Sequence, residues 1–160
     1  MDAGRVISVN VSERKGTPKR PVPEIECRVG SGVVGDAHAG TPGREVSILD
    51  RAEIRAFEVK HGIEVPPGAF AENITTQGLD LSRVEVGDEL LVGEVRLRVT
   101  QIGKPCHEGC AIREAVGDCI MPRVGVFARV ISGGRIRPGD PVWLLKTGEG
   151  GRVTGEKGVL

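Results

Sequence analysis

The sequence predicts a mainly β domain, arranged as a closed barrel with one or two short helices attached. Two observations favour this fold class. Short segments in which apolar and polar residues alternate recur along the chain, as expected for strands with one buried face. Glycine and proline, 24 and 10 of 160 residues, separate these segments and are typical of tight turns. A chain of this length also fits one domain better than two.

The first half of the chain contains three predicted strands. Residues 6–11 alternate apolar and polar side chains, and residues 24–29 and 45–49 are two further strand-like runs. Residues 14–23 are charged and proline-rich, which predicts a loop. Residues 30–40 are too rich in glycine for a regular element.

One convincing helix follows, between Asp50 and Gly62. Asp50 and Glu53 have the spacing of a capping box at a helix start, and Gly62 is placed to end the helix. The residues expected to face the core are Ile54, Phe57 and Val59. The residues expected to face water are Arg51, Arg55, Glu58 and Lys60.

The second half is predicted to be mostly β. Strands are expected at 74–76, 89–92, 95–100, 125–131 and 142–145. The Gly93-Glu94 pair between two of these strands is typical of a hairpin turn, and residues 110–116 are a candidate second helix. Residues 1–146 are therefore expected to form a single domain. Residues 147–160, rich in Gly, Lys and Glu, are expected to form a flexible tail.

Charge and composition argue against several classes of partner. The 22 basic and 22 acidic residues cancel, and the chain has three Phe, one Trp and no Tyr, so neither a basic nor a base-stacking nucleic-acid surface is expected. No run approaches the roughly 18 apolar residues of a membrane helix. The N-terminus has no signal-peptide pattern, so we expect a cytoplasmic protein. In that compartment, four cysteines indicate thiols, metal ligands or catalytic groups more than disulfides.

Cys106 is the first candidate for chemistry. Lys104, His107 and Arg113 lie close to it in sequence, and nearby cations lower the pKa of a thiol toward the reactive thiolate. It could serve as a nucleophile or as a soft metal ligand. The alternative is a small residue buried in a loop, because free cysteines are often buried.

A zinc site is a second interpretation of the same segment. Its candidate ligands are Cys106, His107, Cys110 and Cys119. The spacing gives one close pair of cysteines, whereas structural zinc sites usually have two. Cys27, at the end of a strand-like run, is expected to belong to the core.

Four further residues are candidates for binding. Asp36 and His38, in the glycine-rich segment, could orient one another or a ligand, although a single histidine is more often structural. Arg44 and Arg123 could contact an anion, because guanidinium binds such groups bidentately; either could equally be a solvated charge. Asn73, before a strand, is available for local backbone hydrogen bonds.

The chain resembles the MOSC domain, the C-terminal domain of molybdenum cofactor sulfurases, over roughly residues 6–145. The resemblance rests on motifs that occur in order: Gly35-Asp36-Ala37-His38-Ala39-Gly40, Arg44, Ser47-Ile48-Leu49-Asp50 with Glu53, Gly68-Ala69-Phe70-Ala71-Glu72-Asn73-Ile74, Gly78-Leu79-Asp80-Leu81, Val86-Gly87-Asp88 with Gly93, and Pro105-Cys106. The segments around Cys106 and 117–123 look like a stand-alone subgroup of that family. Cys110 and Cys119 exceed its single-cysteine pattern.

The resemblance implies a barrel similar to the barrel domain of pyruvate kinase. It also implies that Cys106 carries sulfur as a persulfide or ligates molybdenum in a bound pterin cofactor. On this interpretation Lys104, Arg44 and Arg123 hold anionic groups, and Asp36, His38 and Asn73 contribute to the pocket. Partners would be a cysteine desulfurase or another molybdenum-cofactor protein. No pyridoxal phosphate site is expected in a chain of this length.

Three hypotheses therefore remain open. The first is a molybdenum-cofactor or sulfur-carrier protein that depends on Cys106. The second is a zinc-stabilised scaffold or partner-binding module, in which Cys106, Cys110 and Cys119 act jointly. The third, which the resemblance suggests, is a cofactor-dependent component that reduces N-hydroxylated small molecules.

Overall fold

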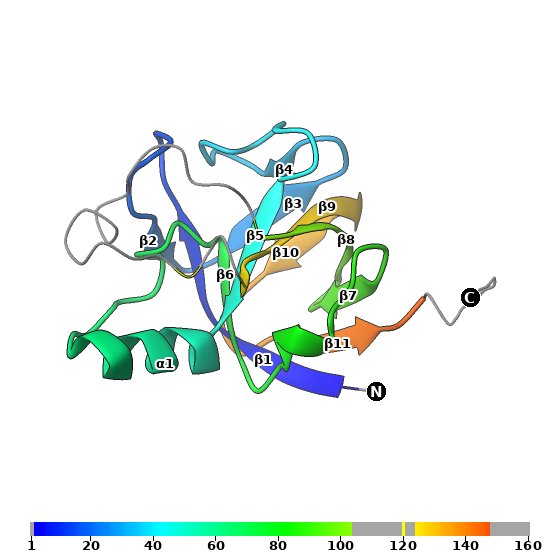
Figure 1. Ribbon diagram of the computed structural model, residues 1–160. Helices are drawn as coiled ribbons and strands as arrows, with labels where there is room; N and C mark the ends of the chain where they lie inside the picture. The colour runs from blue at the N-terminus through cyan, green and yellow to red at the C-terminus, as the bar shows by residue number, and fades with distance from the viewer. Residues whose placement is uncertain (1, 104–119, 121–123, 148–160) are drawn as a thin grey trace.

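The computed structural model describes residues 2–103, 120 and 124–147, and this part of the chain is mainly β (Figure 1). The strands are β1 (Asp2–Val11), β2 (Arg20–Val22), β3 (Ile25–Arg28), β4 (Gly32–Val33), β5 (Val46–Asp50), β6 (Ile74–Gln77), β7 (Glu89–Val92), β8 (Val95–Ile102), β9 (Val126–Ser132), β10 (Gly134–Ile136) and β11 (Pro141–Leu145). The described residues contain one α-helix, α1 (Arg51–His61), and one short 3-10 helix, η1 (Leu81–Arg83).

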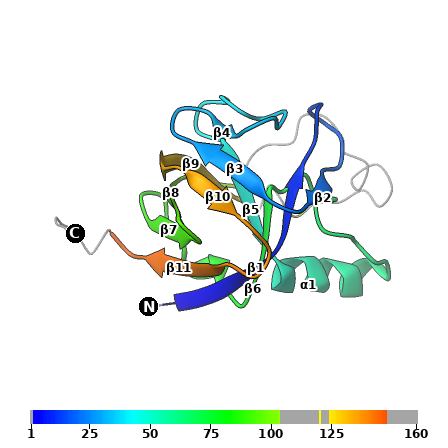
Figure 2. The same cartoon turned by 180° about the vertical axis from the view of Figure 1, so that it is seen from behind.

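Seven strands close into a barrel, which confirms the predicted fold class. The order around the barrel is β11-β7-β8-β9-β5-β6-β1, and β11 pairs with β1 to complete the circle. All of these pairings are antiparallel except that of β5 with β6. Strand β2 extends the sheet beyond β1, and β10, β3 and β4 form a smaller second sheet, which Figure 2 shows from behind.

Three short strands lie where the sequence predicted none. Strand β2 lies in the predicted loop 14–23, β4 lies in the glycine-rich segment, and β10 follows β9 after one residue. Each has two or three residues, too few to show an alternating pattern. Their pairing is determined by a partner strand, such as Val9 of β1 opposite Val22 of β2.

The barrel interior is filled by aliphatic side chains. Buried Val, Ile and Leu residues alternate along the strands with residues that face outward, as in Val95, Leu97 and Val99 of β8. A register shift in the pairing of β1 with β6 occurs between Val6 and Ser8. This shift matters for the site described below, because beyond it Ser8, Asn10 and Ser12 are buried polar residues at alternate positions.

Helix α1 begins and ends where predicted. The Asp50 carboxylate accepts a hydrogen bond from the Ala52 amide (3.1 Å), and Gly62 ends the helix in the left-handed conformation with φ 66°. The helix lies against the outside of the barrel (Figure 1).

Two predictions about the faces of α1 are wrong. Val59 is 69% exposed, whereas Glu58 is buried beside Ile54 and Phe57. Positions 54, 57 and 58 share one helical face, and position 59 does not. Glu58 tolerates burial because its carboxylate accepts the amide N–H of Val65 (2.7 Å). That hydrogen bond, together with the nearby arginines, lowers the pKa of Glu58.

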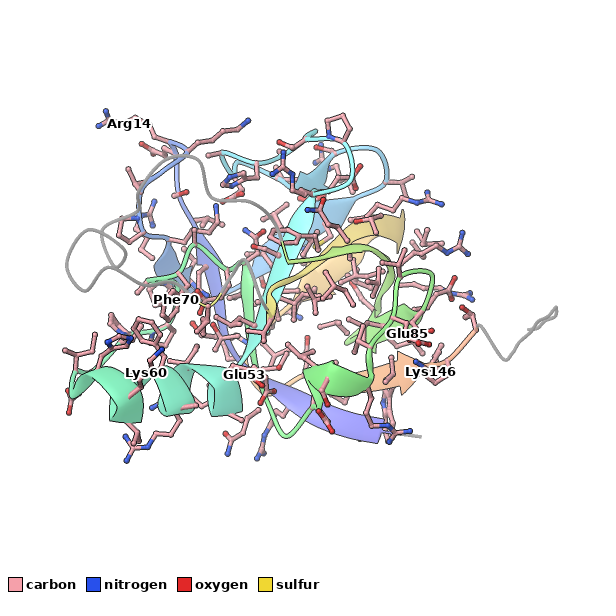
Figure 3. All side chains as sticks on the ribbon, in the orientation of Figure 1. Arg14, Glu53, Lys60, Phe70, Glu85 and Lys146 are labelled. Atoms are coloured by element: carbon pink, nitrogen blue, oxygen red, sulfur yellow. The ribbon has the colours of Figure 1, made fainter. Side chains whose placement is uncertain are left out.

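A second apolar cluster joins the helix to the barrel wall. Phe57 packs edge-on against Phe70, with ring centroids 4.9 Å apart, and Figure 3 shows Phe70 between α1 and the strands. The cluster comprises Leu49, Ile54, Phe57, Val65, Ala69, Phe70, Ile120 and Phe127.

The candidate helix at 110–116 and residues 148–160 of the predicted tail lie outside the described residues. Among the described residues, no helix has both the length and the apolar character needed to cross a membrane.

Candidate functional site

A buried ion pair lies beyond the end of β1. The Lys19 ammonium is 2.8 and 3.0 Å from the two carboxylate oxygens of Asp36, and both side chains are completely shielded from solvent. Asp36 also accepts two backbone N–H groups, from Ser12 to Oδ1 and from His38 to Oδ2, each at 3.0 Å. These contacts join three segments at one point: the end of β1, the loop before β2 and the glycine-rich segment 30–40.

His38 borders this ion pair and reaches the surface. Its Nδ1 atom lies 3.1 Å from the Lys19 ammonium and 3.8 Å from Asp36 Oδ2, and its side chain is 21% exposed. The predicted proximity of Asp36 and His38 is therefore observed. Lys19 lies within hydrogen-bond distance of both.

The charge of Asp36 is strongly stabilised despite its burial. Desolvation by itself would raise the pKa of the carboxyl. The nearby His38 ring, the Lys19 ammonium and the hydrogen bonds from the Ser12 and His38 amides together hold the pKa well below its usual range. The carboxylate is therefore a fixed negative charge.

Asn73 is fully buried, and its side chain makes long-range rather than local hydrogen bonds. Its Oδ1 accepts the backbone N–H of Ser47 (3.0 Å), and its Nδ2 donates to the carbonyl of Asn10 (3.2 Å). The expectation of local backbone bonds is wrong, because strands β5 and β1 lie on either side of this residue. Both ends of the amide are occupied by main-chain partners.

Glu72, next to Asn73, is buried without a full set of partners. Its Oε2 accepts from the Gly68 amide (3.0 Å) and from the Thr75 hydroxyl (2.8 Å). Its Oε1 has no hydrogen-bond partner among the described residues. Burial raises the pKa of this carboxyl, and the hydrogen bonds only partly oppose that effect.

The turn that carries Glu72 is packed tightly against the loop containing Lys19. The Lys19 amide donates to the Gly68 carbonyl (2.8 Å), and a Cβ atom at Gly68 would clash with the Lys19 carbonyl oxygen. Gly68 also has φ +87°, a conformation that favours glycine. The ion pair and the Glu72–Asn73 turn therefore form one continuous buried polar region.

Arg44 lies at the end of the glycine-rich segment and is half-buried. Two successive turns connect it to His38, through the hydrogen bonds from the Thr41 amide to the His38 carbonyl and from the Arg44 amide to the Thr41 carbonyl. Among residues 2–103, 120 and 124–147, no carboxylate forms an ion pair with it.

The remaining predicted site residues belong to segments that the structure does not describe. Cys106, Lys104 and Arg123 lie outside the described residues, as do the other candidate zinc ligands His107, Cys110 and Cys119. Within the described part of the chain, no group of three His, Cys, Asp or Glu side chains could hold a metal ion.

Cys27 belongs to the core, as predicted. It is buried in the barrel cluster, and burial raises the pKa of its thiol to about 12. A thiol with such a pKa carries almost no thiolate at neutral pH, so Cys27 is not a candidate nucleophile.

Sequence reasoning missed Lys19, Ser12 and Asn10. Lys19 lies in a charged, proline-rich loop, where a lysine is normally solvated, and its partner Asp36 is 17 residues away. The alternation of Ser8, Asn10 and Ser12 is visible in the sequence, but it is the pattern of a strand with one polar face exposed to water. Only the neighbouring turns show that this face is covered.

Comparisons with known proteins agree with this architecture. The structure of YuaD from Bacillus subtilis aligns with a TM-score of 0.74 at 18% identity, covering 89% of this chain and 95% of that one. YiiM from Geobacillus stearothermophilus aligns with a TM-score of 0.73 at 24% identity, covering 92% and 77%. At these identities the two structures establish similarity of fold alone.

Sequence comparison identifies the family. The protein YflK of Bacillus subtilis is 27% identical over 146 residues, which cover 85% of this chain and 66% of YflK. The chain thus matches just under two thirds of the length of that relative. The sequence profile of the MOSC domain matches residues 35–143, more than half of the chain. The chain therefore belongs to the MOSC domain family.

Proposed function

We propose that this chain binds a pterin molybdenum cofactor or carries sulfur for it, with Cys106 as the reactive residue. MOSC domains are associated with molybdenum-cofactor binding and with sulfur-related functions. The observation that carries the proposal is the cluster of Lys19, Asp36 and His38, in which a buried ion pair supports a partly exposed imidazole.

Two of the four described candidate residues suit the anionic groups of such a cofactor. His38 reaches the surface, and Arg44 is half-buried with no carboxylate paired to it in the described part of the chain. Their ring and guanidinium N–H groups are suitable donors to phosphate or oxo oxygens. Asp36 and Asn73 are saturated by other partners, so they would act by holding the loops in place. Lys104 and Arg123 are proposed as further cations.

The two versions of the proposal differ in what Cys106 does. When bound, the cofactor would supply a molybdenum centre for oxygen or sulfur chemistry, and the Cys106 thiolate would be a soft ligand for it. As a carrier, Cys106 would attack the outer sulfur of a desulfurase persulfide. The donor thiolate would leave, and Cys106 would hold the sulfur as its own persulfide.

Metal content per chain, measured by mass spectrometry, tests the proposal. The protein would be purified from a host that makes molybdenum cofactor, alongside Cys106→Ala and Cys27→Ala. Because Cys27 is buried in the barrel, its variant controls for loss of a cysteine elsewhere. Molybdenum near one atom per chain that is lost only in Cys106→Ala supports ligation.

Other outcomes decide between the alternatives. Zinc that is retained in Cys106→Ala and lost when Cys110 and Cys119 are both replaced would contradict the proposal and support the zinc-stabilised module. If no sample contains metal, ligation is refuted, and sulfur transfer is tested separately. For that test the chain is incubated with a cysteine desulfurase and cysteine, and a persulfide on Cys106 is sought by intact mass. Absence of both metal and persulfide refutes the whole proposal.

A further inference from the structure

We infer that one outward face of the barrel is a docking surface for an acidic segment of a partner protein. The face spans strands β11, β7, β8 and β9, and Figures 1 and 2 show β7 and β11 on the other side of the molecule from α1. Its central side chains, which we call the arginine face, are Glu89, Leu91, Arg96, Arg98, Arg129 and Trp143. None of the described candidate site residues belongs to it, so this surface does not depend on the proposed cofactor chemistry.

Strand pairing places an apolar row beside an arginine. Trp143 of β11 lies opposite Leu91 of β7, and Leu91 lies opposite Arg96 of β8. Side chains alternate between the two faces of a strand. Val142 and Leu144, on either side of Trp143, belong to the barrel core, so the indole points outward.

The side chains of this face are accessible to a partner. Trp143 is 40% exposed, and the chain has no other tryptophan. The side chains of Arg96 and Arg98 remain 46% and 43% exposed, although both pair with Glu89. Tryptophan and arginine are the residues most enriched among those that dominate binding energy at protein interfaces.

Three guanidinium groups on this face share one carboxylate. Glu89 is almost fully buried and accepts from Nε of Arg96 (2.6 Å) and from Nη2 of Arg98 (2.7 Å). Arg129 of β9 lies directly opposite Arg98 and forms no ion pair with any residue that the structure describes. Three positive charges and one negative charge leave an excess of two positive charges. Like charges at directly opposite positions destabilise a sheet, and a bound carboxylate would relieve this repulsion.

This charge excess favours carboxylates of a protein over other anionic surfaces. Guanidinium groups bind carboxylates through directed hydrogen bonds, as the two arginines on Glu89 show. A nucleic-acid surface would need a basic excess over the whole chain and more aromatic rings for base stacking. A membrane-binding surface would need a wider apolar area than Trp143 beside Leu91. The partner segment therefore carries carboxylates for the arginines and an apolar side chain for Trp143.

Tryptophan fluorescence of the full chain tests the proposal. Trp143 is the only tryptophan, and the chain has no tyrosine, so the emission reports on this face alone. The probe is a synthetic peptide with one leucine among several glutamates, added up to about 1 mM. The expected result is a saturable shift of the emission to shorter wavelength, because the bound peptide shields the indole from water. The same peptide with glutamine in place of every glutamate should give no shift. No shift with the acidic peptide, or equal shifts with both peptides, overturns the proposal.

A pair of charge reversals locates the binding surface. Arg129→Glu should weaken binding of the acidic peptide about tenfold. Arg14→Glu makes the same change in charge on an exposed loop, which Figure 3 shows far from Lys146 at the end of β11, and should leave the affinity unchanged. Equal losses in the two variants overturn the proposal. Urea unfolding checks that Arg129→Glu folds, and Arg129→Gln replaces it if it does not.

The other possible occupants of the face give distinct results. An emission shift with phosphatidylserine vesicles or with single-stranded DNA, but not with the acidic peptide, overturns the proposal in favour of a membrane or a nucleic acid. A shift that occurs on raising the concentration of the chain alone, together with faster sedimentation, indicates a second copy and overturns it as well.

These measurements are separate from the test of the proposed function. Loss of that function appears in the metal content and persulfide of Cys106→Ala, whereas failure of the docking surface appears in the emission of Trp143.

Discussion

Replacing Lys19 by methionine should destabilise the protein strongly at neutral pH and weakly in acid. Methionine keeps most of the aliphatic stem but removes the ammonium that contacts Asp36, Ser12 and His38. Because the Asp36 side chain is fully buried, its charge would lose the ammonium with which it is paired and keep only two backbone N–H donors. Breaking a buried ion pair in this way costs about 3–5 kcal/mol.

An independent argument gives a similar magnitude. The variant can relieve the buried charge by protonating Asp36, which has a pKa of about 3.9 when unfolded. Protonation at pH 7 costs about 1.4 kcal/mol per pH unit above that value, or about 4 kcal/mol. The destabilisation from the buried charge should therefore not greatly exceed this figure.

The same argument fixes the pH dependence. In the wild type the folded pKa of Asp36 is lowered, so its contribution to stability is present above about pH 4 and is lost as the pH falls toward the folded pKa. In Lys19→Met, burial without the ammonium raises that pKa, and protonation of Asp36 relieves the buried charge. The difference between the two proteins should therefore shrink steadily from pH 7 to about pH 4.

Urea unfolding at several pH values measures this difference, with Lys15→Met as the control for removing a positive charge from the same loop. A loss below about 1 kcal/mol at pH 7 would contradict the burial argument. A loss that stays constant from pH 7 to pH 4 would contradict the assignment of the cost to the Asp36 charge.

Three other substitutions test separate features. Gly68→Ala should lower the free energy of unfolding by about 2 kcal/mol more than Gly62→Ala. Only at Gly68 would the added Cβ atom clash with a backbone oxygen, that of Lys19. Equal losses in urea unfolding would count against this packing. The stability of Glu72→Gln relative to the wild type should increase from pH 5 to pH 8. The pKa of Glu72 is raised in the folded state, so above the unfolded value of about 4.3 the wild type loses stability as the pH rises. A pH-independent difference in urea unfolding refutes this prediction. Cys27→Ser should cost about 1–3 kcal/mol by burying a hydroxyl, and the native Cys27 should resist thiol reagents until the chain is unfolded.

Much of the fold could be predicted from local sequence patterns. The ends of α1 could be predicted because Asp50 and Gly62 act on amides and carbonyls within one turn of themselves. The barrel strands could be predicted because alternation is a property of a single segment, as in β8. Closure of the barrel depends on the number of strands and on which strands pair. The sequence predicted a closed barrel but not these pairings.

The polar site was less predictable, because its contacts are distant in sequence. Asn73 bonds Ser47 and Asn10, which lie 26 and 63 residues away. Burial of Glu58 depends on the amide of Val65, beyond the end of the helix. Lys19 has no local feature that distinguishes it from a solvated lysine. Asp36 and His38 could be singled out as a pair, since they are two residues apart.

The pairing of β1 with β11 has a consequence for how the chain folds during synthesis. Asp2 to Arg5 lie opposite Pro141 to Leu144, so the first and last strands of the described chain are neighbours in the barrel. While β11 is still inside the ribosome, β1 has a free edge at that position, and such edges are prone to mispairing. Contacts of such long sequence separation also slow folding. We therefore expect the barrel to close only after β11 has left the ribosome, with β1 held until then by β6 and β2.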